Sequence, residues 1–544
     1  MALVAVSPEH LQAAESGTLS PPDLSSHKIY YVDAITGSDP NEGDHPNCPW
    51  KSLSRANLVH FQPGDSLLLK AGTCYSGQLK PEGFGSVDDI SGKIKPVIIG
   101  RYGEGPNPRI DAEGKYSAAL DLYNVQGYEV SYLDLSNTGP KAEARRWGVY
   151  VHIQEFGKAS HIWLKHLNIH DVNGSPYKDE GSSGALVWSN LGNGRPTFFD
   201  DLCIEDCHVE NCARDGIRGI GSIDTMRTNW HPSLHVVIRN NLIEKIPGDA
   251  IVIKGCDGAL VESNVCRNFI RPPGWDGLGG TVSAGIWPSG SDNTIIQFNE
   301  VSGCNSQQDG QGFDSDWNCR NTIIQYNYSH DNEGGFLLVC NPGDKKMPAN
   351  VGCIGTIVRY NVSVNDGLRA AGKTLAHAPI FHFGGSVKDT KIYNNTIIVP
   401  AKPNRKIDKS MVYCSDWNGG MPDNIWFANN IFYVEGDTRY IWSDGKKGVA
   451  TNYLFEGNLY VGTHKNLPND PQAIQADPLF VNLKSPQDGL ASLSGLRLRA
   501  NSPAIGKGVP ISANDPPMRD IAGTIIPNNR PVSLGAFEFE PAEK

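Results

Sequence analysis

The chain has 544 residues and a formal net charge of -11, and its 59 glycines and 36 prolines stand against only 6 methionines. The negative charge argues against a nucleic-acid or anionic-membrane partner, because the electrostatic contribution would oppose binding. No apolar run is long enough to cross a bilayer as a helix. Short Val/Ile-rich runs bounded by Asn, Asp and Gly predict strands and turns, so we expect mostly β structure.

Residues 1–28 are polar and aperiodic, which predicts an N-terminal tail. They contain neither a basic leader nor an apolar run of signal-peptide length, so we expect a secreted or periplasmic protein whose export signal is absent from this sequence. In residues 29–145, turn signals separate short apolar runs such as Tyr30–Asp33 and Ser66–Leu69. This pattern predicts an N-terminal cap and the first coils of a stacked β structure, whose open end needs covering.

The 12 cysteines form no CxxC pair and no zinc-binding spacing with histidine. Cys48 with Cys74, and Cys340 with Cys353, are possible disulfides. Buried free thiols are an equally good interpretation. The cysteines therefore leave the redox compartment open.

A repeat begins near residue 146 and recurs at intervals of roughly 23 to 35 residues, the scale of one supersecondary unit. Its first segment alternates apolar and polar residues and ends in Asn, in the copies Gly258–Asn264, Asn293–Asn299, Asn321–Asn327, Gly355–Asn361 and Asp389–Asn395. Asn tolerates left-handed turns and can hydrogen-bond to its counterpart in the next copy. Stacked copies therefore predict an internal Asn ladder. The alternative is that Asn marks exposed turns.

A second apolar segment follows the first after a turn, in the copies Gly184–Trp188, Gly216–Ile220, Ala250–Lys254, Gly285–Ser289, Gly312–Asp316 and Gly335–Val339. Two strand columns at constant phase predict a coil of parallel strands, whose side chains alternate between interior and outside. A helix would need apolar spacings of three and four, and a β-propeller would need hairpin turns.

We therefore predict an all-β, right-handed parallel β-helix of about ten coils. Residues 146–465 form its core and carry the site, and residues 466–544 form a C-terminal closing segment.

Motifs at both ends of the chain support this architecture. They are Tyr30–Asp33, Pro49–Leu53 and Pro63–Asp65 at the start, and Ala476–Phe480, Ser502–Ile505 and Leu534–Glu538 near the end. Together with the repeat they resemble the secreted, pectin-lyase-like superfamily of parallel β-helix proteins that act on carbohydrates. That superfamily includes hydrolases, lyases, epimerases and binding proteins, so function has to come from the site.

The acidic cluster Asp309, Asp314 and Asp316 interrupts the otherwise neutral or bulky repeat. It resembles the cluster of β-helix glycoside hydrolases of the lacto-N-biosidase type, and the resemblance implies a catalytic pair at Asp309 and Asp316. Asp314 is an equally good candidate from its position. Asp314 and Asp316 would lie on one strand face with Cα atoms about 6.6 Å apart. That is closer to the carboxyl spacing of inverting than of retaining glycosidases.

The outer face of the second segment supplies the remaining candidates. Reading each copy outward from its glycine places Trp188, Arg218, Lys254 and Trp287 beside the aspartates as substrate-binding residues. Aromatic faces stack on sugar rings, and two nearby carboxylates raise one another's pKa so that one can stay protonated. The alternatives are that Asp-x-Asp holds calcium or is simply solvated, and that Lys254 and Arg218 form salt bridges.

Residues in turns complete the list of substrate-binding candidates. Trp275 and Asp276 lie in a long Gly/Pro-rich loop, which could overhang the site. His330 and Glu333 follow the next first-segment strand and could supply a second carboxylate from a neighbouring coil.

We expect a glycoside hydrolase that cleaves a polysaccharide or oligosaccharide by carboxylate acid/base catalysis, without a cofactor. One alternative is a Ca²⁺-dependent polysaccharide lyase or uronate epimerase, with Lys254 or Arg218 as base. Another is a carbohydrate-binding solenoid without catalysis. The sequence predicts a carbohydrate partner but no oligomeric state.

Overall fold

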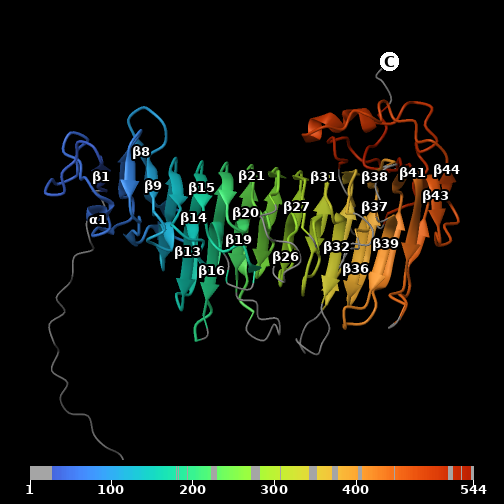
Figure 1. Ribbon diagram of the computed structural model, residues 1–544, viewed down its shortest axis with the longest axis horizontal. Coiled ribbons are helices and arrows are strands. Elements are labelled where there is room, and N and C mark those ends of the chain that lie inside the picture. Colours follow the sequence, from blue (N-terminus) through green and yellow to red (C-terminus); the bar gives the residue numbers. More distant parts are fainter. Residues whose placement is uncertain are drawn as a thin grey trace, which may run out of the picture.

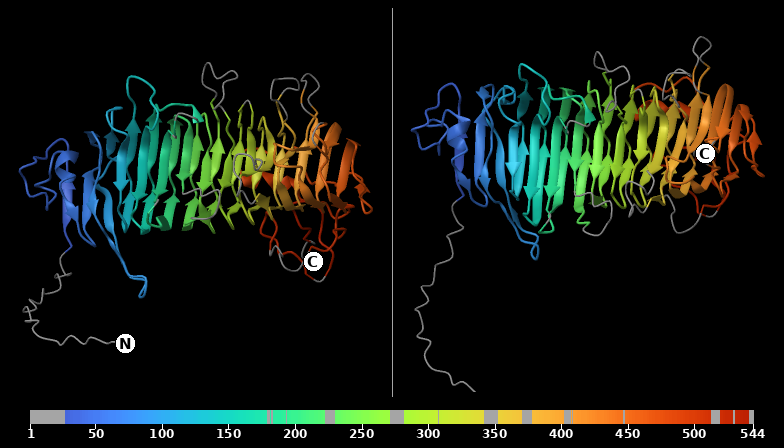
Figure 2. Two further views of the ribbon diagram at one scale, coloured as in Figure 1. Left: turned by 90° about the horizontal axis from the view of Figure 1, so that it is seen from below. Right: turned by 60° about the horizontal axis from the view of Figure 1, so that its bottom comes forward.

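The protein winds into an elongated parallel β-helix (Figures 1 and 2). The computed structural model describes residues 27–178, 181, 183–192, 194–221, 230–270, 282–306, 308–341, 352–369, 378–401, 407, 409–445, 448–511, 519–528 and 530–540. The predicted tail therefore falls almost wholly outside the described residues. No helix in these ranges is long and apolar enough to span a membrane. The predicted all-β solenoid is confirmed.

One flank of the solenoid is a long parallel sheet that starts at β1 (Ile29–Val32). Its strands correspond to the first segment of the repeat. In order along the sheet they are β3 (Ser66–Lys70), β8 (Val97–Tyr102), β11 (Tyr128–Ser131), β14 (Lys158–Lys165), β17 (Phe198–Glu205), β20 (Ser233–Arg239), β24 (Leu260–Glu262), β27 (Ile295–Gln297), β30 (Ile323–Gln325), β34 (Ile357–Arg359), β37 (Val387–Tyr393), β40 (Asp423–Ala428) and β42 (Leu454–Glu456), with β23 (Cys256–Asp257) beside β20 and β33 (Cys353–Ile354) beside β37.

In most coils the rest of the chain contributes two strands rather than the single one expected from the sequence. The first of them forms what we call the middle row: β4 (Cys74–Ser76), β9 (Arg109–Asp111), β12 (Asp134–Asn137), β15 (Asn168–Val172), β18 (His208–Cys212), β21 (Leu242–Glu244), β25 (Val265–Arg267), β28 (Glu300–Ser302), β31 (Tyr328–His330), β35 (Val362–Val364), β38 (Thr396–Val399), β41 (Ile431–Ile441), β43 (Leu459–Lys465) and β44 (Ile474–Gln475).

The second of them, which we call the site row, corresponds to the second segment of the repeat. Its strands are β10 (Ala118–Tyr123), β13 (Trp147–Gln154), β16 (Gly184–Leu191), β19 (Asp215–Ile220), β22 (Ile251–Lys254), β26 (Ile286–Ser289), β29 (Gln311–Ser315), β32 (Gly335–Asn341), β36 (Phe381–Gly385) and β39 (Ser410–Ser415). Each strand pairs in parallel with the one a coil away.

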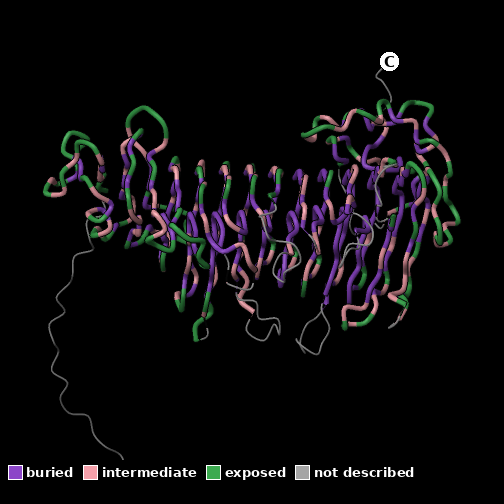
Figure 3. Tube along the Cα trace, viewed as in Figure 1, coloured by how far each residue is buried: buried purple, intermediate pink, exposed green. Residues whose placement is uncertain are grey.

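A column of apolar side chains sets the phase of the site row. Ile217 pairs with Ile251, Ile251 with Ile286, and Ile286 with Phe313, and all of them are fully buried in the core. Burying such a side chain contributes about 1.5–3 kcal/mol. Their neighbours in sequence consequently point outward, because side chains alternate along a strand. Figure 3 shows buried residues along the strands of most coils, with exposed residues mainly at the turns and at the two ends of the solenoid.

Trp188 lies inside the core, so its predicted place on the outer face is wrong. It pairs with Val151 and with Gly219, and none of its surface is exposed. A Cβ atom at Gly219 would lie 2.5 Å from the indole ring, so the glycine makes room for it. Aligning the copies by their glycines puts Gly184 level with Gly216. In the structure Gly184 pairs with Asp215, one residue earlier, and this shift of one residue turns Trp188 inward.

The predicted internal Asn ladder is confirmed. It runs through Asn241, Asn264, Asn299, Asn327, Asn361, Asn395, Asn430 and Asn458, each at most 1% exposed. At each step the backbone N–H and Nδ2 of one Asn donate to Oδ1 of the next, as from Asn299 to Asn327 at 2.9 and 3.0 Å. The side chains therefore satisfy polar groups in the interior of the coils from Asn241 to Asn458.

Both ends of the described solenoid carry irregular structure. Near the N-terminus, α1 (Leu53–Ala56) is capped by Ser52, and two small strand pairs join β2 (His60–Phe61) to β5 (Glu82–Gly83) and β6 (Ser86–Val87) to β7 (Ile94–Lys95). The C-terminal segment folds back beside the later coils and carries the 3-10 helix η2 (Leu490–Leu496) (Figure 1). Its Leu493 and Leu534 belong to the same buried apolar cluster as Val362 and Leu459 of the middle row.

All 12 cysteines lie in the described ranges and are free thiols. The possible Cys48–Cys74 and Cys340–Cys353 disulfides are therefore not formed. Cys340 and Cys353 are both buried, which agrees with the alternative of buried thiols.

Candidate active site

The three aspartates of the acidic cluster lie on and beside strand β29. Phe313 and Ser315 face the core and are fully buried. Asp314, between them, and Asp316, just after them, therefore lie on the outer face. Asp309 lies in the turn that precedes the strand. The backbone N–H of Asp316 donates to the Pro288 carbonyl at 3.1 Å, which continues the ladder beyond the end of β29.

Asp314 is the most deeply buried of the three. Only 4% of its surface is exposed, and its Oδ1 has no hydrogen-bond partner. Burial raises the pKa of Asp314 well above its usual value, and the charges of Asp309 and Asp316 add to this effect. Burial also raises the pKa of Asp309 to about 6, with Asp316 adding to the effect and Lys178 opposing it. The three carboxyl groups are thus electrostatically coupled.

Asp316 differs from the other two because donors stabilise its anion. Its Oδ1 accepts hydrogen bonds from Cys340 Sγ at 2.9 Å and from the Trp317 N–H at 2.8 Å. Burial raises the pKa of Asp316, but these two donors, Lys178 and Lys254 act in the opposite direction. Asp316 also remains partly exposed. It is therefore the carboxylate best placed to meet a ligand as an anion.

Two lysines and a tryptophan border the aspartates on the N-terminal side. Trp287 occupies the position next to Asp314 on the adjacent strand, and the Nζ atoms of Lys178 and Lys254 lie 5.0 and 5.6 Å from the centre of its ring. Trp287 points outward as predicted from the phase, but it is only 3% exposed. Burial, together with the like charges of Arg218 and Lys178, lowers the pKa of Lys254 to about 8.

Arg218 belongs to a buried ion network beneath these groups. It is 6% exposed, and its Nη1 lies 2.6 Å from Asp215 Oδ2 and 3.7 Å from Asp249 Oδ2. Arg214 and Lys178 also contact Asp249, at 3.0 and 3.6 Å. Although burial opposes ionisation, these cations hold the pKa of Asp249 at about 2. The salt-bridging alternative for Arg218 is thus the one seen in the structure.

Arg369 holds the turn that carries Asp309. Its Nη1 donates to the Gln308 carbonyl at 3.0 Å, and its Nη2 donates to the carbonyls of Ser306, at 2.6 Å, and of Asp309. The side chain is only 3% exposed. A guanidinium from a later coil therefore fixes the position of this turn relative to the strand.

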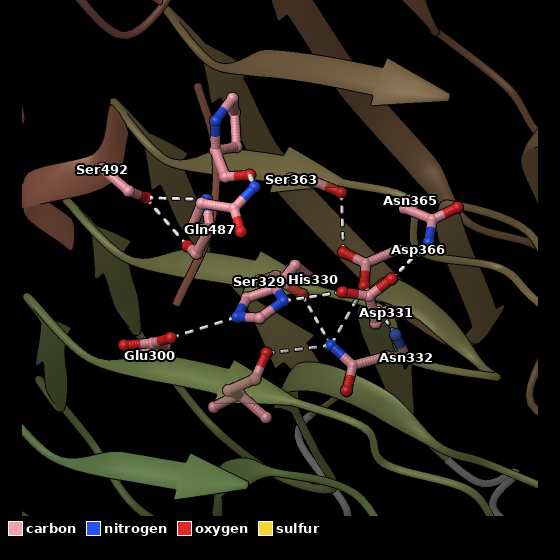
Figure 4. Close-up of polar contacts among 12 residues, drawn as sticks. Glu300, Ser329, His330, Asp331, Asn332, Ser363, Asn365, Asp366, Gln487 and Ser492 are labelled. Atoms are coloured by element: carbon pink, nitrogen blue, oxygen red, sulfur yellow. Dashed lines mark hydrogen bonds and ion pairs between the residues drawn. The ribbon is translucent and has the colours of Figure 1, made fainter. Parts of the chain in front are cut away.

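His330 lies in the middle row rather than in the site row that carries the aspartates, and its role in substrate binding stays a prediction. It belongs to β31 of the middle row, where Nε2 contacts Glu300 at 3.1 Å and Nδ1 contacts Asp331 at 2.8 Å (Figure 4). Burial opposes its protonation, but these carboxylates outweigh burial and raise the pKa of His330 to about 9. The N–H of Gly489, from the C-terminal segment, also donates to Glu300 at 2.8 Å.

Glu333 lies in the turn next to that of Asp309. Its neighbour Gly334 donates its N–H to the Gly310 carbonyl at 2.9 Å, and the Glu333 carbonyl accepts from the Arg369 N–H at 3.1 Å. Trp275 and Asp276 fall outside the described residues. The sequence analysis did not identify four residues around the cluster: Lys178, Asp249, Cys340 and Arg369. Each of them reaches the cluster from a different coil, and no local pattern marks it.

Replacing Asp314 by Asn should stabilise the fold near neutral pH. The pKa of Asp314 is raised above that of an unfolded Asp, so the native state holds its proton to higher pH and loses stability as pH rises through this window. Replacing the ionisable carboxyl group by a neutral amide should add about 0.5–2 kcal/mol to the free energy of unfolding at pH 7, and less near pH 4. Urea denaturation at both pH values measures this difference.

Asp437→Asn is the matched control, because hydrogen bonds from Lys409 and Lys465 lower the pKa of Asp437 to about 2. It should not stabilise the protein at either pH. Equal effects of the two substitutions, or a loss of stability in Asp314→Asn, would contradict the assignment of Asp314 as a carboxyl group whose pKa is raised by burial.

Known proteins resemble the chain in sequence and in fold. A family model described as "Right handed beta helix region" matches residues 204–432. The chain is 27% identical over 643 aligned residues to a lacto-N-biosidase of Bifidobacterium longum subsp. longum, an alignment that covers 97% of this chain but only 37% of that protein. The crystal structure of a GH136 lacto-N-biosidase from Eubacterium ramulus superposes with a TM-score of 0.56 and 23% identity, covering 81% of this chain and 68% of the other.

Proposed function

We propose that this protein is a glycoside hydrolase that cleaves a glycosidic bond with carboxyl groups from the cluster Asp309, Asp314 and Asp316. The observation that carries the proposal is the contrast within the cluster. Burial raises the pKa of all three carboxyl groups, but Asp316 alone among them has its anion stabilised by hydrogen bonds, from Cys340 and the Trp317 N–H. Glycosidic hydrolysis needs one carboxylic acid and one carboxylate.

Asp309 is a better general acid than Asp314. A pKa of about 6 lets it hold its proton in mildly acidic solution and still release it to the leaving oxygen. Asp316 then acts on the anomeric carbon, either directly or through a water molecule. Asp314, which is almost wholly buried, keeps a proton between them and limits the negative charge of the site. The resemblance to lacto-N-biosidase-type enzymes supports the same pair.

Substrate and cellular location are also part of the proposal. The Bifidobacterium relative is named for the hydrolysis of a lacto-N-bioside, and the alignment to it covers almost all of this chain. We take lacto-N-bioside-containing oligosaccharides as the first substrates to try, ahead of other polysaccharides. Action outside the cytoplasm suits such a glycan substrate.

The test is a substrate panel that contains an aryl lacto-N-bioside, single-ring aryl glycosides and polysaccharides, followed with and without EDTA. New reducing ends without the ultraviolet absorbance of an unsaturated uronate, unaffected by EDTA, support hydrolysis. Absorbance that EDTA abolishes would instead mean a lyase with metal-binding aspartates. In the described part of the chain, two groups of three residues lie close enough to share a metal ion, and neither contains the aspartates of the cluster. One group is His208, Glu210 and Glu244, and the other is Glu300, His330 and Asp488.

Cys340→Ala should shift the acidic limb of the pH dependence of kcat/KM to higher pH. The thiol hydrogen bond lowers the pKa of Asp316, so losing it raises that pKa, and Asp316 must be deprotonated to act. A hydrogen bond to a charged group is worth roughly 1.5–3 kcal/mol and one pKa unit is about 1.36 kcal/mol, so a weak thiol donor should give a shift of up to about one unit.

Cys340→Ser keeps a donor and should leave the limb near its original position. Cys414→Ala serves as the control, because Cys414 is a fully buried thiol facing the core of the site row. An unchanged limb in Cys340→Ala, with activity otherwise measurable, would show that the thiol does not set the ionisation of Asp316.

A further inference from the structure

The outer row of side chains that contains Asp316 continues into the next three coils. Ser315 pairs with Val339, so Cys340 occupies the position beside Asp316 on the next strand. The hydrogen bond from Cys340 to Asp316 agrees with this register. Cys340 pairs in turn with Gly384, and Gly384 with Ser415. The surface reached from Asp316 along the solenoid therefore passes over a glycine two coils away.

The ring of Trp417 fills the space above that glycine. A Cβ atom at Gly384 would lie 2.8 Å from both Cδ2 and Cε2 of Trp417, so the indole lies directly against the strand backbone. Trp417 comes from the turn after β39 and folds back over β36, the strand of the preceding coil. It remains partly exposed, unlike the tryptophans that pack within the core.

The turn that holds Trp417 has an unusual backbone. Its φ is 37°, a left-handed conformation that is rare for a bulky side chain and costs on the order of 1–3 kcal/mol. Asp416 supports the turn, because its Oδ1 accepts the Asn418 N–H at 2.6 Å and its carbonyl accepts the Gly419 N–H at 2.7 Å. Such strain persists where the surrounding structure requires the residue to stay in place.

Polar groups surround the ring. His382, on the outer face of β36, lies nearly perpendicular to the indole, with ring centres 5.6 Å apart at 86°. His382 Nε2 lies 3.2 Å from Ser415 Oγ, and the partly exposed Tyr413 ring lies 5.3 Å from His382. An indole face bordered by hydroxyl and imidazole groups matches a pyranose ring, which has an apolar C–H face and a rim of hydroxyl groups.

We propose that Trp417 is the stacking platform of a sugar-binding subsite, one or two sugar units from the bond cleaved at Asp316. Two coils separate them, roughly 10 Å at about 4.8 Å per coil, and a pyranose unit is about as long as one coil spacing. The proposal rests on the proposed glycoside hydrolase function, because it takes Asp316 as the point of cleavage. It adds that the enzyme binds a substrate extended along the solenoid towards its C-terminal end.

The test compares Trp417→Ala and Trp417→Phe on an aryl lacto-N-bioside and on an oligosaccharide that extends it. Losing one stacking contact should reduce kcat/KM on the extended substrate by roughly 10- to 200-fold, and Trp417→Phe should recover most of the loss. The size of the effect on the aryl substrate shows on which side of the cleaved bond the subsite lies. Unchanged kcat/KM on both substrates would overturn the proposal, as would equal losses in the Ala and Phe variants accompanied by a lower Tm.

Trp163→Ala is the matched control. Trp163 is a partly buried tryptophan on β14 in the opposite sheet, and its Nε1 donates to Asp201 at 2.9 Å. It should leave kcat/KM unchanged on both substrates.

Calorimetric titration of the Asp316→Asn variant with the extended oligosaccharide separates this proposal from the proposed function. Binding that weakens about 10-fold or more when Trp417→Ala is added supports the subsite, whether or not the parent protein hydrolyses the sugar. Hydrolysis by the parent protein, combined with binding that does not depend on Trp417, removes the subsite and leaves the hydrolase.

Discussion

Asp316→Asn is expected to lower kcat/KM by about 100- to 10,000-fold, the usual contribution of a catalytic carboxyl group. The amide oxygen can still accept from Cys340 Sγ and from the Trp317 N–H, so the local structure should be kept. The negative charge is lost, and with it the group that we propose acts on the anomeric carbon. Reducing-end assays measure the activity, and circular dichroism with thermal unfolding verifies the fold.

Two comparisons make this result specific. Asp437→Asn, which removes a partly exposed carboxylate paired with Lys409 and Lys465, should retain full activity. In Asp316→Gly, added azide should restore cleavage of an aryl glycoside if Asp316 is a nucleophile, because the small anion can occupy the vacated position. Activity of Asp316→Asn within about two-fold of the parent would remove Asp316 from the catalytic machinery.

Asn327→Leu is expected to lower the free energy of unfolding by about 3–5 kcal/mol. Oδ1 of Asn327 accepts from the backbone N–H and Nδ2 of Asn299, and its Nδ2 donates to the Ile296 carbonyl at 2.8 Å and to Asn361 Oδ1 at 3.0 Å. Leucine fills a similar volume but leaves these buried groups unpaired, and each unpaired group costs about 1–3 kcal/mol. Urea denaturation measures the loss.

Asn168→Leu provides the comparison, because Asn168 is an exposed residue at the start of β15 and lies outside the ladder. Its substitution should change the free energy of unfolding by no more than about 0.5 kcal/mol. A cost below about 1 kcal/mol for Asn327→Leu would show that the ladder accompanies the fold without stabilising it.

Much of the fold was predictable from the sequence because each coil repeats the same demands. Alternating apolar residues recur in successive coils, and a buried Asn accompanies them from Asn241 to Asn458, so the strands of one flank and the ladder could be predicted from a few copies. Trp188 could not be placed in this way. Its inward direction depends on the space left by Gly219 one coil later, and a glycine-based alignment of single copies carries no information about that neighbour.

The aspartates of the site were visible because carboxylates interrupt an otherwise neutral strand. Their partners were not, since Lys178, Cys340 and Arg369 approach from turns and strands of other coils. His330 shows the opposite problem. It follows the site closely in sequence, but its strand belongs to the middle row, where it contacts Glu300 and the aromatic ring of Tyr328 instead.

The central claim is that the cluster around Asp316 hydrolyses a glycosidic bond. The most direct measurement is mass spectrometry of the products formed from an oligosaccharide in water labelled with heavy oxygen. Hydrolysis predicts one heavy oxygen in each new reducing-end sugar from the parent protein, and about 100-fold or more slower formation of that product by Asp316→Asn. An unlabelled, unsaturated product would contradict the account, because it would mean that the bond is broken by elimination.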